Sequence, residues 1–265
     1  MKLNFVKYQG AGNDFVIVDA RGQKFSPSTE IVAKVCRRFF GVGADGFMAL
    51  EDDPHQQFYM RYYNSDGSES TMCGNGGRCI AMFAHQSGIG GKNLVFNSSD
   101  GKHAAEIISA DPTGGIVKLG MADVKGIENF TKDLFIDTGS PHYVRFVDQI
   151  DFVNVPVTGA SIRNSEYFAP IGGTNVNFVQ VMDDGVIKVR TFERGVEDET
   201  LACGTGAVAA AIATHFSRQS ETTDYTVETR GGTLEVSFKA AGKQTFKNIS
   251  LQGEARRVFK GEIEV

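Results

Sequence analysis

The chain has 265 residues, a formal net charge of −5 and 41% hydrophobic residues, which is enough for one large domain or two small ones. It has no basic cluster for nucleic acid, no apolar run long enough to span a membrane, and no signal-peptide core at its N-terminus. We therefore expect a cytoplasmic protein with no nucleic-acid or membrane partner.

Short segments rich in β-branched and aromatic residues dominate the chain, and turn residues bound most of them. They predict strands at residues 15–19, 58–63, 94–98, 115–120, 142–147, 177–182, 186–192, 233–238 and 257–265. Helical patterns are few. One helix is expected at residues 27–39, capped by Ser26, with Ile31, Val35 and Phe39 on one face.

The four cysteines separate into two kinds. Neither an export signal nor a short C-x-x-C spacing is present, so a disulfide framework and a zinc site are not indicated. Cys36 and Cys79 lie inside helical patterns and are expected to be small core residues. Cys73 and Cys203 instead each stand where a helical pattern begins.

The sequence around Cys73 resembles the sequence around Cys203. Both read Glu, three residues, then Cys-Gly-x-Gly, and residues 60–76 align with residues 189–206 with one extra residue in the second copy. Residues 13–19 similarly resemble residues 177–183. Together the two similarities predict an internal duplication.

A duplication of this kind predicts an α/β (α+β) fold of two pseudo-symmetric domains. Each would be a curved, mostly antiparallel sheet around a central helix, with the active site in the cleft between them. We expect the domains to comprise residues 1–117, with Cys73, and residues 118–265, with Cys203.

A cysteine at a helix start can serve as an acid or a base. The first N–H groups of a helix have no partner within the helix, and the helix dipole makes this end positive. Such a place binds carboxylates and lowers the pKa of a thiol. Two such sites facing each other could hold a carboxylate, remove the α-proton on one face and return a proton on the other.

Other interpretations of the cysteines remain open at this point. A single Cys at a helix start is more often structural than catalytic. Cys73 and Cys203 could also form a disulfide that switches activity, as in a thiol-based redox sensor. The duplication favours the acid–base interpretation, because packing alone gives no reason to repeat a reactive residue.

The motifs resemble those of the diaminopimelate epimerase family along nearly the whole chain. The matching segments are GNDFVIVD, NSDGSESTMCGNGGRC, FERGVEDETLACGTGA, GSPH, TNVNFVQV and GEARRVFKGEIEV. The resemblance implies a homodimer of two-domain chains whose closing segment crosses back to the first domain. It also implies conversion of LL- to meso-2,6-diaminopimelate in lysine and cell-wall synthesis, by two thiols and with no cofactor or metal.

The resemblance assigns roles to individual residues. Cys73 and Cys203 correspond to the catalytic thiols, and His142 with Glu193 to groups that tune the thiol pKa values. The reacting carboxylate would be held by Gly74, Asn75, Gly204 and Thr205. The distal end of the substrate would be recognised by Asn13, Asn64, Asn175, Glu193 and Arg194. An arginine fork suits the distal carboxylate and a glutamate the distal ammonium.

Two positions depart from the family pattern. Ser140 stands where Asn is frequent, which puts one substrate contact in doubt. Gly46 stands where Gln is frequent, which would leave room for water. Proline racemases use the same fold and thiol pair, and isomerases related to phenazine synthesis share the fold. A substrate without a second amino-acid end would leave Glu193 and Arg194 unpaired.

Overall fold

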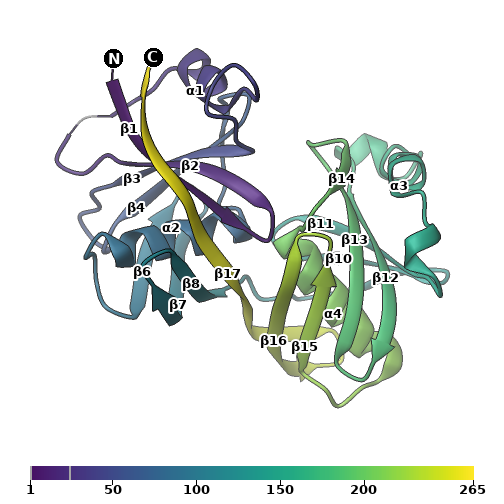
Figure 1. The fold of residues 1–265 in the computed structure, drawn as a ribbon. Coiled ribbons are helices and arrows are strands. Elements are labelled where there is room, and N and C mark those ends of the chain that lie inside the picture. The colour runs from purple at the N-terminus through teal and green to yellow at the C-terminus, as the bar shows by residue number, and fades with distance from the viewer. Residues whose placement is uncertain (1, 24) are drawn as a thin grey trace. The chain divides into compact units, whose positions relative to one another are not determined.

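A computed structural model describes residues 2–23 and 25–265, and its contacts divide the chain into two units (Figure 1). The first comprises the residues up to Leu119 together with Gly253–Val265, and the second comprises Gly120–Gln252. The first unit extends two residues beyond the expected boundary at 117, because Leu119 still pairs with Ala105. In the described part of the chain, no helix is long and apolar enough to cross a membrane.

The first unit is a ring of strands around one helix. Its elements are β1 (Lys2–Gly10), β2 (Asn13–Asp19), α1 (Thr29–Cys36), β3 (Gly46–Glu51), β4 (Tyr59–Asn64), β5 (Glu69–Ser70), α2 (Gly74–Gln86), β6 (Asn93–Ser98), β7 (Gly101–Asp111), β8 (Gly114–Gly120) and the end of β17 (Thr245–Glu264). Pairing runs β17–β1–β2–β3–β4–β6–β7–β8 and returns to β17. Helix α2 packs against β1, β2, β3 and β7 and is buried along most of its length, so it forms the core of the unit.

The second unit has the same plan around α4. Its elements are β9 (Glu128–Phe130), β10 (Asp133–Asp137), β11 (Pro141–Phe146), η1 (Ile150–Phe152), α3 (Val155–Arg163), η2 (Ala169–Ile171), β12 (Asn175–Asp183), β13 (Val186–Glu193), β14 (Asp198–Thr200), α4 (Gly204–Arg218), β15 (Asp224–Thr229), β16 (Gly232–Gly242) and the start of β17. Neighbours pair in the order β10–β11–β12–β13–β15–β16–β17. Helix α4 contacts most of these strands and is buried in its first three turns.

Matching the pairings element by element confirms the pseudo-symmetry. Strand β2 pairs in parallel with β3 across α1, and β11 pairs in parallel with β12 across α3. Likewise β4 runs parallel to β6 across α2, and β13 runs parallel to β15 across α4. The similarity of residues 60–76 to 189–206 therefore joins equivalent elements.

The second sequence similarity, between residues 13–19 and 177–183, joins elements that are not equivalent. Residues 13–19 form β2, which precedes the crossover helix of its unit, whereas residues 177–183 lie in β12, which follows it. The structural counterpart of β12 is β3. That part of the predicted duplication was wrong. Two buried strands of similar composition can resemble each other in sequence without occupying equivalent positions in the two units.

The glutamate that precedes each cysteine has a structural role. Arg61 Nη1 lies 2.9 Å from Glu69 Oε1 in the first unit, and Arg190 Nε lies 2.7 Å from Glu199 Oε1 in the second. Each ion pair ties the short strand before the cysteine to the long strand beside it. The repeated Glu therefore fixes the turn that presents the thiol.

The predicted helix at residues 27–39 is shorter than expected. It begins at Thr29 after the cap Ser28, whose side chain accepts the N–H of Ile31, and it ends at Cys36. Ser26 is not the cap, and Phe39 lies beyond the helix, 99% exposed. All nine predicted strands are present. The strands that were not predicted are β1, β3, β5, β7, β9, β10, β14 and β15, and helix α3 was not predicted either.

Candidate active site

The two sequence-predicted thiols occupy the same structural position. Cys73 is the N-cap of α2 and Cys203 is the N-cap of α4, both with extended backbone. In each case the cysteine carbonyl accepts the first intrahelical hydrogen bond, from Gly77 N at 2.7 Å and from Ala207 N at 2.9 Å. The N–H groups before these have no partner within their helices, so each thiol stands beside backbone donors suited to an anion.

In the first unit, the structure brings Cys73 together with Asn13 and Asn75. The Oδ1 atom of Asn13 accepts the thiol of Cys73 at 3.6 Å and the Nδ2 of Asn75 at 3.4 Å. Its Nδ2 donates to Asp45 Oδ2 at 2.7 Å. Because the carboxylate accepts only, the amide of Asn13 is fixed with its oxygen towards Cys73.

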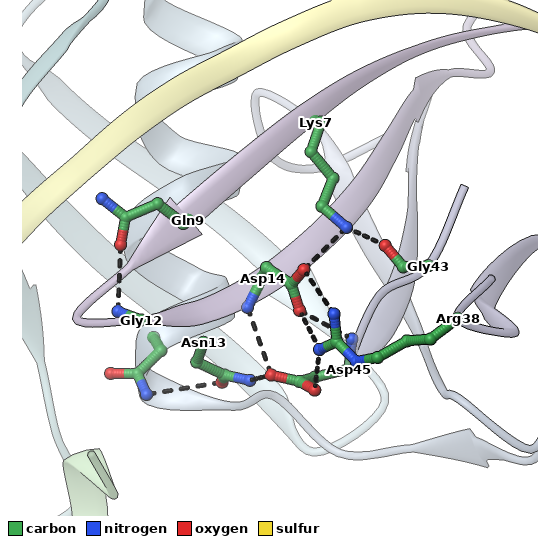
Figure 2. Close-up of polar contacts among 9 residues, drawn as sticks. Lys7, Gln9, Gly12, Asn13, Asp14, Arg38, Gly43 and Asp45 are labelled. Atoms are coloured by element: carbon green, nitrogen blue, oxygen red, sulfur yellow. Dashed lines mark hydrogen bonds and ion pairs between the residues drawn. The ribbon is translucent and has the colours of Figure 1, made fainter. Parts of the chain in front are cut away.

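Behind Asn13 lies a charge network that the sequence did not reveal (Figure 2). Arg38 donates to Asp14 at 2.8 Å and to Asp45 at 2.7 Å, and Lys7 lies 2.8 Å from Asp14 and also donates to the carbonyl of Gly43. Burial opposes ionisation of Asp14, but the two cations outweigh it and hold its pKa below the usual range. The network anchors Asp45, which in turn orients Asn13.

Asn64 and Gly46 face each other where β4 and β3 meet. The Nδ2 of Asn64 donates to Ser68 Oγ at 3.2 Å within the turn that follows. A Cβ on Gly46 would lie 2.6 Å from the ring of Tyr62 and 2.8 Å from its hydroxyl. The expected room for water at Gly46 is therefore filled by the tyrosine ring.

In the second unit, Asn175 is fixed by the segment that contains Ser140. Its Nδ2 donates to Ser140 Oγ at 2.9 Å and to the carbonyl of Pro141 at 3.0 Å. Its Oδ1 accepts the backbone N–H of Arg194 at 2.9 Å. Ser140 thus orients Asn175, and Asn175 holds the backbone that carries Glu193 and Arg194.

His142 is fully buried and bonded to an asparagine that sequence reasoning missed. The Nδ1 atom of His142 lies 3.0 Å from Asn177 Nδ2. An amide NH2 group can only donate a hydrogen bond, so Nδ1 accepts it. Asn177 Oδ1 accepts the hydroxyl of Thr191 at 2.9 Å. The signal available was a second asparagine two residues after Asn175, which places Asn177 on the same face of β12.

Thr205 links the start of α4 to the turn between β10 and β11. Its hydroxyl lies 3.5 Å from Cys203 Sγ, and its carbonyl accepts the hydroxyl of Thr138 at 3.1 Å. A hydroxyl can donate to a thiolate or accept from a thiol, so Thr205 suits both protonation states of Cys203.

Each unit therefore holds a thiol at a helix start, with fixed amide or hydroxyl groups beside it. The family model described as diaminopimelate epimerase matches residues 5–125 and 134–258. The chain belongs to the diaminopimelate epimerase family. The match covers both thiols and the polar groups around them.

Named relatives agree with this assignment. A diaminopimelate epimerase from Flavobacterium psychrophilum is 44% identical over 262 residues, covering 98% of this chain and 100% of the relative. One from Aquifex aeolicus is 39% identical over 280 residues, covering 98% of each. Among solved structures, a PhzF-family phenazine biosynthesis protein from Bacillus anthracis has a TM-score of 0.78 at 16% identity, over the full length of both chains. That likeness shows the fold.

For this epimerase-family chain, the state of His142 makes a testable difference to stability. Burial, assisted by the charge of Arg194, lowers the pKa of His142 from 6.5 to about 3. Below pH 6.5 the unfolded chain binds a proton that the folded chain does not. Stability is therefore complete above pH 6.5 and is lost as the pH falls towards 3.

We expect the free energy of unfolding to fall by about 1.4 kcal/mol per pH unit from this residue in that window. Urea unfolding between about pH 7 and pH 4 measures it, with His142→Asn as the comparison. The variant should show a shallower dependence on pH, whatever its absolute stability. Equal slopes for the two proteins would contradict the assignment of a buried neutral histidine.

Proposed function

We propose that this protein interconverts LL- and meso-2,6-diaminopimelate and thereby serves lysine and peptidoglycan precursor synthesis. The observation that carries the proposal is the family match across both units, each with a cysteine at the start of its central helix. The substrate has two amino-acid ends, and the chain has polar groups suited to both. No cofactor enters the proposed reaction.

In the proposed mechanism, Cys73 and Cys203 act on one α-carbon from opposite faces. One thiolate removes the α-proton while the other thiol delivers a proton to the opposite face, which inverts the stereocentre. The α-carboxylate takes up negative charge as the carbanion forms. Backbone N–H groups at Gly74 and Asn75, and at Gly204 and Thr205, are proposed to stabilise that charge.

The distal end of the substrate is proposed to bind to the fixed polar side chains of both units. Arg194 would pair with the distal carboxylate and Glu193 with the distal ammonium. The proposed amide contacts are Asn13, Asn64 and Asn175. Asp45 holds Asn13 and Ser140 holds Asn175, so these amides are oriented before any substrate binds.

His142 is proposed to act as a neutral group. The low pKa leaves the ring uncharged at neutral pH, so it cannot lower a thiol pKa through positive charge. Its contribution is to hold Asn177 next to the first turn of α4. Any tuning of the thiols by a charged side chain is therefore proposed for Glu193 alone of the two residues first expected to tune them.

The test is α-proton exchange in heavy water with purified protein, LL-diaminopimelate and no added cofactor. Deuterium should appear at the α-carbon, together with the meso isomer. Proline serves as the comparison, because it lacks the second amino-acid end and should not exchange. Exchange from proline but not from diaminopimelate would replace the proposed substrate, and no exchange from either would end the proposal.

Quaternary structure and location follow from the same family resemblance. We propose a homodimer in the cytoplasm. Light scattering during gel filtration measures the mass, which should be twice the 28.7 kDa of one chain. A monomer at micromolar concentration with full activity would contradict the dimer.

A further inference from the structure

Arg78 is a buried cation five residues after Cys73. The side chain is 0% exposed. Its Nη2 donates to Asn75 Oδ1 at 2.8 Å and its Nη1 donates to the carbonyl of Gly74 at 3.3 Å, while Nε has no partner among the described residues. Among the described residues, no carboxylate forms an ion pair with Arg78. A buried charge of this kind is strongly unfavourable unless an anion compensates it.

The guanidinium lies at the end of the helix where a cation is least favourable. Both of its acceptors, Gly74 and Asn75, belong to the first turn of α2. The helix dipole already makes this end positive, so cations are normally placed at the other end. Arg78 therefore adds to a positive potential at the point where the first backbone N–H groups are located.

Among the described residues, the ionisable groups that act on Arg78 are the thiols of Cys79 and Cys73. Burial raises the pKa of Cys79 to about 12, so Cys79 stays neutral at neutral pH. An anion for Arg78 must therefore be the thiolate of Cys73 or a ligand at the start of the helix.

Other ionisable groups on the elements around α2 have partners of their own or are exposed. On β1, Tyr8 has a raised pKa because of burial and donates to Gln86. Asp14 of β2 pairs with Lys7 and Arg38, Glu51 of β3 with Arg61, and Asp100 beside β7 with His103. Asp19 of β2 pairs with Arg21 and Asp111 of β7 with Arg256, while Glu106 and Lys102 of β7 are exposed. None of these pairings supplies a charge to Arg78.

The second helix start has no such cation. Val208 stands five residues after Cys203, where α2 has Arg78, and it is 0% exposed. Thr205 replaces Asn75, the residue that Arg78 holds. The pseudo-symmetry of the two units therefore stops at this position, and the difference is a full charge.

We propose that Arg78 is a positioning residue that orients Asn75 and supplies the buried charge which favours an anion at the start of α2. That anion is the Cys73 thiolate and, during the reaction, the carboxylate of the substrate. This inference deepens the proposed function and rests on it. It makes the two thiols unequal, because α2 carries a buried cation five residues after its cysteine and α4 has Val208 at that position.

Asn13 opposes part of this effect, because its oxygen accepts the thiol proton of Cys73. A thiol is a weak hydrogen-bond donor, whereas a charge in a dry interior acts strongly. We therefore expect the cation to dominate. Replacing Arg78 with a neutral residue that can still donate hydrogen bonds isolates the effect of its charge on the pKa of Cys73.

The experiment measures the pKa of Cys73 from the rate of alkylation by iodoacetamide against pH, in a Cys203→Ala background. Cys36 and Cys79 are buried and unreactive under these conditions. Arg78→Gln should raise the pKa of Cys73 by about one unit or more, and Arg78→Lys, which keeps the charge, should keep it within about half a unit. Val208→Ala is the matched control: it should lower the melting temperature and leave that pKa unchanged.

An unchanged Cys73 pKa in Arg78→Gln would overturn the proposal. If that variant does not fold, the Cys73 pKa of the parent Cys203→Ala protein tests the proposal. The proposal requires this pKa to lie clearly below the ordinary thiol value of about 8.5, and a value at or above it would overturn the proposal. In the two-thiol enzyme, kcat should fall at least about tenfold in Arg78→Gln and be largely restored in Arg78→Lys. Thiol titration needs no substrate, so its failure is distinct from a failure of α-proton exchange.

Discussion

Replacing Cys203 with Ala is expected to abolish the conversion of LL- into meso-diaminopimelate while the protein stays folded. A positioned acid or base contributes about 10²–10⁴-fold, and alanine has no proton to give or take. The rate should therefore fall by about 10³-fold or more. Cys73→Ala should have the same effect, since inversion needs a group on each face. The measurement is polarimetry or chiral chromatography of the product, with circular dichroism to confirm the fold.

A matched control for these substitutions is Cys36→Ala. Cys36 is buried in the core cluster around α1 and β3, with a thiol pKa that burial raises to about 12. It lies in the first unit as Cys73 does, but among apolar side chains. We expect full activity and a loss of about 1 kcal/mol of stability. Full activity in Cys203→Ala, with the control unchanged, would end the two-thiol mechanism.

Adding one methyl group at Gly206 is the second substitution expected to have a large effect. A Cβ there would lie 2.4 Å from Asn177 Oδ1 and 3.4 Å from Cys203 Sγ. Asn177 is held by His142 and Thr191, so it cannot retreat without breaking buried hydrogen bonds. Gly206→Ala should cost about 1–3 kcal/mol of stability from overpacking and lower kcat by about tenfold or more through the displaced thiol.

The equivalent glycine of the first unit provides the comparison for Gly206→Ala. At Gly76 the nearest atoms to a Cβ would be Met48 Sδ at 3.3 Å and Met60 Cε at 3.5 Å. Methionine side chains adapt to small changes in packing, and alanine favours the helix over glycine by about 1 kcal/mol. Gly76→Ala should therefore be tolerated. Chemical denaturation and steady-state kinetics on both variants test the difference; similar losses in the two would show that Asn177 is not the cause.

Nine strands were predictable because they are short and rich in β-branched or aromatic residues, with turn residues at most of their ends. Strands β3 and β7 lack that signal, whereas β1 (KLNFVKYQG) and β15 (DYTVET) carry it and were missed. Strand β3 is buried almost throughout and reads GFMALE, and β7 contains Ala-Ala-Glu, which favours a helix. Helix α3 was missed because its nine residues include valines, threonine, glycine and proline, which are poor helix formers. Packing against β12 and β13 decides its conformation.

For the site, sequence identified residues whose type and spacing already imply chemistry. Cys73 and Cys203 were found because the motif repeats. Asn177 and Arg78 were not, since the importance of each comes from what surrounds it in three dimensions. Asp45 was missed for a different reason: an Asp beside glycines resembles an ordinary turn residue.

The order in which the ribosome makes this chain has a consequence for strand β17. Its first part pairs with β16, while residues Arg256–Glu264 complete the ring of the first unit by pairing with β1 (Figure 1). During synthesis, β1 therefore has an open edge until residues Arg256–Glu264 leave the exit tunnel. The second unit, whose elements are contiguous, is complete earlier. The half of the protein that is translated first is the half that finishes folding last, and its exposed strand edge is the point at which nascent chains are most prone to aggregate.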